Sequence, residues 1–168
     1  MHAVAVYTIT KIITGKISLK ILLFYFAFMQ IVLISTVAGA HRLWSHRAYN
    51  AKLPLRIFLM IFSSMSLQGP IHLWARWHRQ HHKFSDTAGD PHNPTRGFFF
   101  AHIGWFCMYN HQKFLNNSRD NIVTEDLERD EVVMWQLRNY YCFAHSSWGS
   151  KPYDKYLAPS RIKVINLL

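Results

Sequence analysis

Hydrophobic side chains are concentrated in the first half of the chain, and their longest run is Ile21 to Ala40, twenty residues without a charged side chain. A helix of that length rises about 30 Å, which is the thickness of the hydrocarbon core of a bilayer. A fully buried core helix is the alternative, but buried runs of this length are rare in small domains. We therefore expect a transmembrane helix here.

Two shorter apolar stretches flank this run. Ala3 to Ile13 is too short to cross a bilayer alone, and it lacks the basic leader and small-residue cleavage site of a signal peptide. Leu53 to Leu73 contains Arg56 and other polar residues, so we expect a helix that lies at the membrane interface or packs on protein. Further along, Thr124 is expected to cap a helix whose last turn holds Arg138.

Charge is distributed unevenly along the 168 residues. The net charge is +10; residues 1–85 hold ten Lys or Arg and no Asp or Glu, whereas residues 86–168 hold nine of each sign. A basic excess indicates either a nucleic-acid partner or cytosolic flanks of membrane segments. Because the basic half is also the apolar half, we expect a lipid bilayer and no nucleic acid. Four basic residues on the histidine side of the long run, against three on the other, predict that this side faces the cytosol.

Five of the eleven histidines form two clusters after the long apolar run. His78, His81 and His82 are spaced i, i+3, i+4, so on a helix they share one face. His41 and His46 are five residues apart, about 140° around an ideal α-helix. We therefore expect that this pair does not readily chelate one ion, and that it serves either two ions or one ion with a bend in the chain.

The ligand types narrow the choice of metal. Two cysteines form no disulfide framework and no Cys-rich zinc site, and the first 85 residues offer no carboxylate for a Glu-based di-iron site. Five histidines exceed the needs of a tetrahedral zinc ion, so we expect an all-histidine pair of metal ions suited to O₂ chemistry on an apolar substrate. Asp86 and Asp90 are candidates either to orient a ligand histidine or to stabilise turns. His92 is expected to be structural or to support a ligand. The isolated histidines are interpreted as structural: His2, His72, His102 and His111.

Several segments carry a resemblance to a known family. Gly39 to His46 (GAHRLWSH) contains the first histidine pair, Trp77 to Ser85 (WHRQHHKFS) the second cluster, and Asp90 to Asn93 follows. Over residues 1–140 the chain resembles the membrane fatty acyl-CoA desaturases, specifically the Δ9 (stearoyl-CoA) type of animals. Ala144 to Lys155 is similar to a family segment that lies after a second pair of membrane helices.

The resemblance implies an all-α fold of integral membrane helices with a cytosolic, histidine-rich helical cap, present here in partial form. Residues 1–40 would be a membrane hairpin with an incomplete first helix, residues 41–140 the histidine-box region, and residues 141–168 a displaced remnant of the C-terminal cytosolic region. The second membrane hairpin and the last histidine box have no counterpart. The implied iron ligands are His41, His46, His78, His81, His82 and His145.

The resemblance also implies an activity. An enzyme of this family uses two iron ions (Fe²⁺), O₂ and electrons from cytochrome b5 to place a cis double bond in a saturated fatty acyl-CoA. It would be a multi-pass protein of the endoplasmic reticulum membrane whose histidine boxes face the cytosol. The expected substrate contacts are Gln68, Arg76 and Trp77. Trp77 stands where the family has Asp and Gly69 where it usually has Asn, and a family Arg-Lys pair is Tyr109-Asn110 here. The alternative is therefore an inactive paralogue that binds metal weakly or associates with an intact desaturase.

Overall fold

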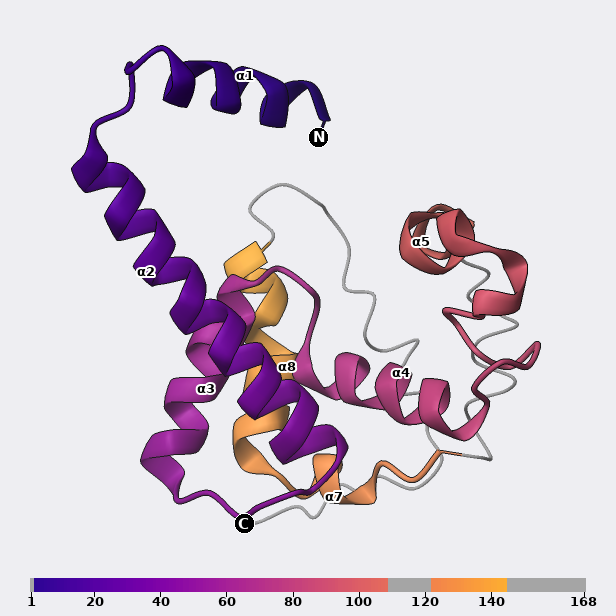
Figure 1. Ribbon diagram of the computed structural model, residues 1–168. Coiled ribbons are helices and arrows are strands. Elements are labelled where there is room, and N and C mark those ends of the chain that lie inside the picture. Colours follow the sequence, from indigo (N-terminus) through magenta and orange to yellow (C-terminus); the bar gives the residue numbers. More distant parts are fainter. Residues whose placement is uncertain (1, 109–121, 145–168) are drawn as a thin grey trace.

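The computed structural model describes residues 2–108 and 122–144, and these residues form helices without any strand (Figure 1). In chain order the helices are α1 (His2–Ile13), α2 (Leu19–Ser35), the π-helix η1 (Thr36–Ser45), α3 (Leu53–Met65), α4 (Ile71–Lys83), the short 3-10 helix η2 (Pro94–Arg96), the short π-helix η3 (Phe100–Gly104), the single-turn α5 (Trp105–Cys107), α7 (Glu125–Glu128) and α8 (Glu131–Ala144). The all-helical class expected from the sequence is thus observed in the described residues.

The long apolar run forms one continuous helix, because η1 follows α2 without a break. Together they span Leu19 to Ser45, which is 27 residues, and within the described residues this is the helix long and apolar enough to cross a membrane. Only 17 % of its most apolar window is buried, and Phe24 is 73 % exposed. The described residues therefore do not enclose it as a soluble protein encloses a core helix. Figure 1 shows α2 running from α1 into the body formed by the other helices.

The third apolar stretch is two helices rather than one. α3 ends at Met65, and α4 begins at Ile71 after a turn that contains Leu67 and Gly69 at positive φ (56° and 98°). Pro70 precedes the first residue of α4, where its fixed φ suits a helix start. The turn redirects the chain, so that the histidines of α4 lie beside η1.

One apolar core holds η1, α3, α4, α7 and α8 together. Its buried members are Trp44, Leu59, Met60, Ile71, Ala75, Leu127, Val132 and Val133. They come from segments that are far apart in sequence. The burial of these side chains therefore supplies most of the free energy that holds residues 122–144 against the histidine-bearing helices.

The helix expected after Thr124 is interrupted. Thr124 makes no side-chain cap, and its hydroxyl donates instead to Glu128 at 2.9 Å. α7 ends at Glu128, and Asp130 begins α8 by accepting from the backbone N–H groups of Val132 and Val133 at 3.0 and 3.1 Å. The prediction of one helix up to Arg138 was therefore wrong, because Asp130 satisfies the first donors of a new helix.

Asp130 also joins α8 to the first half of the chain. Its other carboxylate oxygen accepts from Trp44 Nε1 at 3.0 Å. Arg56 of α3 forms an ion pair with Asp130 through the oxygen that begins α8. The side chains of Arg56 and Asp130 are 26 % and 15 % exposed, so water screens this pair only partly. Carboxylates of the second half thus neutralise arginines of the acid-free half.

Candidate metal centre

The first two histidines meet because the helix that carries them is a π-helix. The backbone N–H of His46 donates to the His41 carbonyl at 3.0 Å, an i→i+5 bond, and the Ser45 hydroxyl donates to the Ala40 carbonyl at 2.6 Å. In this wider turn residues five apart lie over one another. The two Nε2 atoms are 3.1 Å apart. The expectation that this pair is poorly placed to share an ion was therefore wrong, since it assumed α-helical geometry.

α4 brings two further histidines to the same place. His78 and His82 are one helical turn apart, and their Nε2 atoms are 3.0 Å from each other. His78 Nε2 is also 2.9 Å from His46 Nε2, which joins the two clusters. The four potential ligand atoms of His41, His46, His78 and His82 all lie within 4.8 Å of one another. The structure thus assembles one four-nitrogen group from two pairs of histidines that are more than thirty residues apart.

The electrostatics of this group favour neutral imidazoles. Burial, followed by the charges of His41, His82 and its other histidine neighbours, lowers the pKa of His78 to about 3. Burial and the neighbouring histidines also lower the pKa of His46. At neutral pH these rings therefore present the unprotonated form that binds metals.

Hydrogen bonds among the rings do not satisfy this arrangement. A neutral imidazole nitrogen either donates or accepts, yet His46 Nε2 faces both His41 and His78, and His78 Nε2 faces both His46 and His82. A metal ion with bonds of about 2.1 Å places tetrahedral nitrogen ligands about 3.4 Å apart, close to the observed 2.9–3.1 Å. The donor set suits zinc, iron, copper or nickel.

The fifth clustered histidine is held differently. His81 Nδ1 is 2.8 Å from a carboxylate oxygen of Asp90, and Asp90 is buried and also accepts from the backbone N–H of His92. The His81 ring centroid lies 6.2 Å from that of His78 and 5.4 Å from that of His92. Asp90 therefore fixes the orientation of the His81 ring, and the Nε2 atom of that ring remains available to bind a metal ion. Of the two candidate aspartates, Asp86 contributes only its backbone N–H, to Asp90 at 3.3 Å.

Two further histidines were assigned roles from the sequence: His145 as a metal ligand and His72 as a structural residue. His145 lies outside the described residues. His72 is 5 % exposed on α4, and burial lowers its pKa, which agrees with a structural rather than a ligand role. Its Nε2 is 3.9 Å from Glu128, so it packs between α4 and α7.

The three substrate candidates lie at and just before α4. The Gln68 side-chain carbonyl accepts from Trp74 Nε1 at 3.0 Å, and the Trp74 ring stacks on His78 with centroids 5.0 Å apart. Gln68 is therefore connected to the histidine group through one aromatic ring. Arg76 is half-buried, and Trp77 meets Trp105 edge to face at 6.0 Å.

Two arginines and an aspartate that lie beside the histidines were not predicted from the sequence. Asp126 of α7 accepts two hydrogen bonds from Arg79 and two from Arg47, all between 2.7 and 2.9 Å. Burial raises the pKa of Asp126, but the hydrogen bonds and charges of Arg79 and Arg47 outweigh burial and lower it to about 2. The sequence does contain a signal for the two arginines, because Arg47 directly follows His46 and Arg79 directly follows His78.

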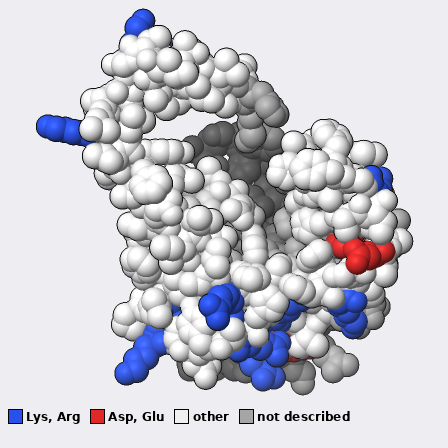
Figure 2. All heavy atoms as spheres, viewed as in Figure 1, with Lys and Arg blue, Asp and Glu red and all other residues white. Residues whose placement is uncertain are grey.

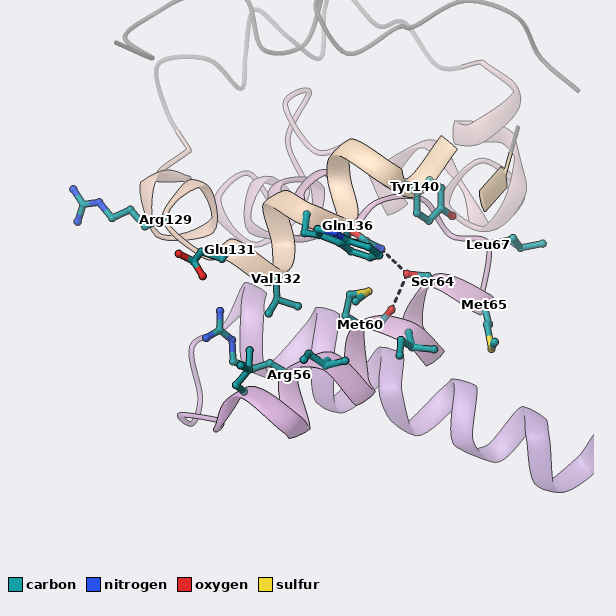
Figure 3. Close-up of a pocket in the computed structure, with 14 residues that line it drawn as sticks. Arg56, Met60, Ser64, Met65, Leu67, Arg129, Glu131, Val132, Gln136 and Tyr140 are labelled. Atoms are coloured by element: carbon teal, nitrogen blue, oxygen red, sulfur yellow. Dashed lines mark hydrogen bonds between the residues drawn. The ribbon is translucent and has the colours of Figure 1, made fainter. Parts of the chain in front are cut away.

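A separate cavity of about 960 Å³ lies between α3 and α8 (Figure 3). Its walls are mostly apolar, and they include Met60 and Val132. Along one side Gln136 donates to the Ser64 hydroxyl at 2.8 Å, and Ser64 donates to the Met60 carbonyl at 2.7 Å. None of the residues that line it belongs to the four-histidine group.

Charge on the visible face of the molecule is segregated. Figure 2 shows few charged atoms over α1 and α2, whereas Lys and Arg gather at the end of the molecule farthest from α1. This polarity matches an apolar arm joined to a charged, histidine-bearing body.

No protein-family profile matches the chain. Individual curated proteins do. The chain is 49 % identical over 140 residues to acyl-CoA desaturase 1 of Tachysurus fulvidraco, which covers 83 % of the chain and 41 % of that protein. It is 43 % identical over 176 aligned positions to human stearoyl-CoA desaturase 5, covering 97 % of the chain and 52 % of the relative. It is 45 % identical over 141 residues to an acyl-CoA Delta12-desaturase of Acheta domesticus, covering 84 % and 39 %. The chain thus spans about half the length, or less, of these relatives.

Proposed function

Because the chain is a homologue of the animal acyl-CoA desaturases, we propose that this protein introduces a double bond into a fatty acyl-CoA. The observation that carries the proposal is the convergence of His41, His46, His78 and His82 on one point. Zinc does not change its oxidation state, so a redox reaction on an unactivated hydrocarbon requires a metal such as iron.

The residues present fit such a metal. The four imidazoles supply neutral nitrogen donors, and His81, oriented by Asp90, supplies a further donor for a second ion. Bound iron would supply the oxidising power needed to remove hydrogen from an alkyl chain. The protein's part is to hold these rings, to position the substrate and to exclude water from the site.

The overall reaction balances as follows. Two C–H bonds on adjacent carbons break and a second C–C bond forms, which releases two electrons and two protons. Two further electrons and two protons enter from outside, and one O₂ is reduced to two waters. We propose cytochrome b5 as the electron donor, a saturated acyl-CoA such as stearoyl-CoA as the substrate, and the Δ9 position as the site of the cis double bond.

The membrane setting follows from the same reasoning. We propose that Leu19–Ser45 crosses the bilayer, since it has the required length and apolar character. The part that crosses would be the uncharged run from Ile21 to Ala40, so that His41 and the other histidines lie just beyond the membrane, on the basic side that faces the cytosol. We propose that this membrane is that of the endoplasmic reticulum. The proposed cofactor is a pair of iron ions.

A second candidate is a metal-binding relative without desaturase turnover. Trp77, which replaces the Asp expected from the resemblance, packs on Trp105 and brings an apolar ring where the family has a charge. Such a protein would retain the histidine group but bind the CoA moiety poorly. This candidate would bind metal weakly through the same histidines or associate with an intact desaturase, and it would form no double bond itself.

The two candidates separate in one experiment. The full chain is expressed in membranes of a host without its own desaturase, loaded with iron and supplied with cytochrome b5 and stearoyl-CoA. The lipid products are then analysed by mass spectrometry. A cis-monoene that requires O₂ and is lost in the combined variant His78→Ala, His81→Ala and His82→Ala supports the desaturase. Iron retained without any monoene supports the second candidate, and neither iron nor product would refute both. His102→Ala, a substitution outside both clusters, is the matched control.

A further inference from the structure

One carboxylate joins the two histidine-bearing segments. Arg47 follows His46 at the end of η1, and its Nε and Nη2 donate to the two oxygens of Asp126 at 2.9 and 2.8 Å. Arg79 follows His78 on α4, and its Nη1 and Nη2 donate to the same two oxygens at 2.8 and 2.7 Å. Both contacts are bidentate, the geometry that gives a guanidinium–carboxylate pair its directional strength. We call these three residues the Asp126 clamp.

Arg79 adds bonds that reach the π-helix itself. Its Nη2 donates to the Trp44 carbonyl at 2.6 Å and its Nε to the Ser45 carbonyl at 3.1 Å. These carbonyls belong to the last residues of the π-helix η1, where hydrogen bonds within the helix no longer satisfy them. The Arg79 side chain is only 12 % exposed. A single side chain of α4 therefore holds the end of the element that carries His46.

The backbone at the same point is strained. Arg47 has φ of +52°, a left-handed conformation that is uncommon outside glycine and asparagine. It ends the π-helix directly after His46. Strained conformations of this kind persist only where surrounding contacts fix them. The contacts here include the two hydrogen bonds from Arg47 to Asp126 and a backbone hydrogen bond from the Ala48 N–H to the Arg42 carbonyl at 2.9 Å.

We propose that the Asp126 clamp positions His46 against His78 and so sets the geometry of the four-histidine metal site. The clamp touches no ligand nitrogen, and its three members are positioning residues. The inference rests on the proposed metal site but not on desaturase activity. In the proposed arrangement, Asp126 holds the residue that follows each of two histidines, His46 and His78, whose Nε2 atoms are 2.9 Å apart.

A purely structural ion pair is the competing explanation. Asp126 is 33 % exposed, and exposed ion pairs commonly contribute little to stability. Under that explanation, loss of the carboxylate alters folding stability slightly and leaves metal binding unchanged. Under our proposal, metal affinity falls by about 10–100-fold, the range found when groups supporting metal ligands are removed.

The test uses Co²⁺ as the probe, since its visible absorption reports ligand number and geometry. The full chain in detergent micelles is titrated with Co²⁺ as the unmodified protein, as Asp126→Asn and as Glu125→Gln. Glu125 lies on the same short helix, is exposed and contacts neither arginine, so it is the matched control. Far-ultraviolet circular dichroism of the metal-free proteins compares their folding. Arg47→Asn is the second variant, because asparagine tolerates the left-handed backbone and only this arm of the clamp is lost.

We expect a Co²⁺ Kd at least about tenfold higher and an altered spectrum in Asp126→Asn, a smaller change in the same direction in Arg47→Asn, and no change in Glu125→Gln. If Asp126→Asn loses helical signal, Arg47→Asn decides the question. Unmodified affinity and spectrum in a folded clamp variant would overturn the proposal. Failure of the unmodified chain to bind Co²⁺ would overturn the metal site and the clamp together. Tight binding without desaturation would refute only the proposed activity.

Discussion

Gly39 offers the sharpest test of how the π-helix is packed. A Cβ added at this position would lie 2.9 Å from Trp44 Cζ3 and 3.2 Å from Leu59 Cβ. Neither neighbour moves easily: Trp44 and Leu59 are 4 % and 2 % exposed, and Trp44 is hydrogen-bonded to Asp130. Gly39→Ala therefore overpacks the core beside the segment that holds His41.

The magnitude follows from two opposing effects. Overpacking a dense core costs about 1–3 kcal/mol. Replacing a helical glycine by alanine returns about 0.5–1 kcal/mol through backbone entropy. We expect a net loss of about 1–2 kcal/mol in the free energy of unfolding, which lowers Tm by about 2–8 °C. Trp44→Phe removes the ring atom that clashes, so the cost of Gly39→Ala should shrink in that background.

The assay is thermal unfolding of the metal-free chain in detergent, followed by circular dichroism. Gly104→Ala is the matched control, because Gly104 is also helical and an added Cβ would meet its neighbours at 3.4–3.5 Å, an ordinary contact. The control should be neutral or slightly stabilising. Equal Tm values for Gly39→Ala and Gly104→Ala would refute the packing described around η1.

The folded pKa of Asp126, about 2, lies below its ordinary value, so its ion pairs contribute stability above about pH 4 that is lost as pH falls toward 2; the Tm difference between the unmodified chain and Asp126→Asn should shrink over that interval, and a constant difference would contradict it. Gln136→Leu removes the acceptor for the backbone N–H of Ile71 at 2.9 Å and should cost about 1–3 kcal/mol, measured by thermal unfolding. His78→Ala should abolish iron retention in metal analysis, because His78 touches the ligand candidates His46 and His82, whereas His102→Ala, a change outside the four-histidine group, should leave it unchanged.

The sequence predicted the parts of the site that depend on regular local geometry. His78 and His82 share a face because α4 is an ordinary α-helix, and the apolar run from Ile21 forms a long exposed helix. The prediction failed for His41 and His46, because the choice between α- and π-bonding depends on the surrounding packing. Trp44, which follows in the same element, is fixed by Asp130, a contact that spans 86 residues.

The ion pairs between the two halves of the chain were also not predicted from the sequence. No pattern in the sequence predicts a partner for Asp126 or Asp130. In the structure they neutralise Arg47, Arg79 and Arg56, which come from the acid-free half of the chain. The charge asymmetry was visible in the sequence, but the pairing required the fold that the apolar core imposes.

Iron X-ray absorption spectroscopy of the iron-loaded full chain can decide whether the four histidines form a metal centre. Imidazole rings bound through Nε2 give a characteristic outer-shell scattering pattern that oxygen ligands lack. We expect this pattern in the unmodified chain, a weaker pattern in His46→Ala and an unchanged pattern in Glu125→Gln. Bound iron with only oxygen scattering, or no retained iron, would contradict this expectation.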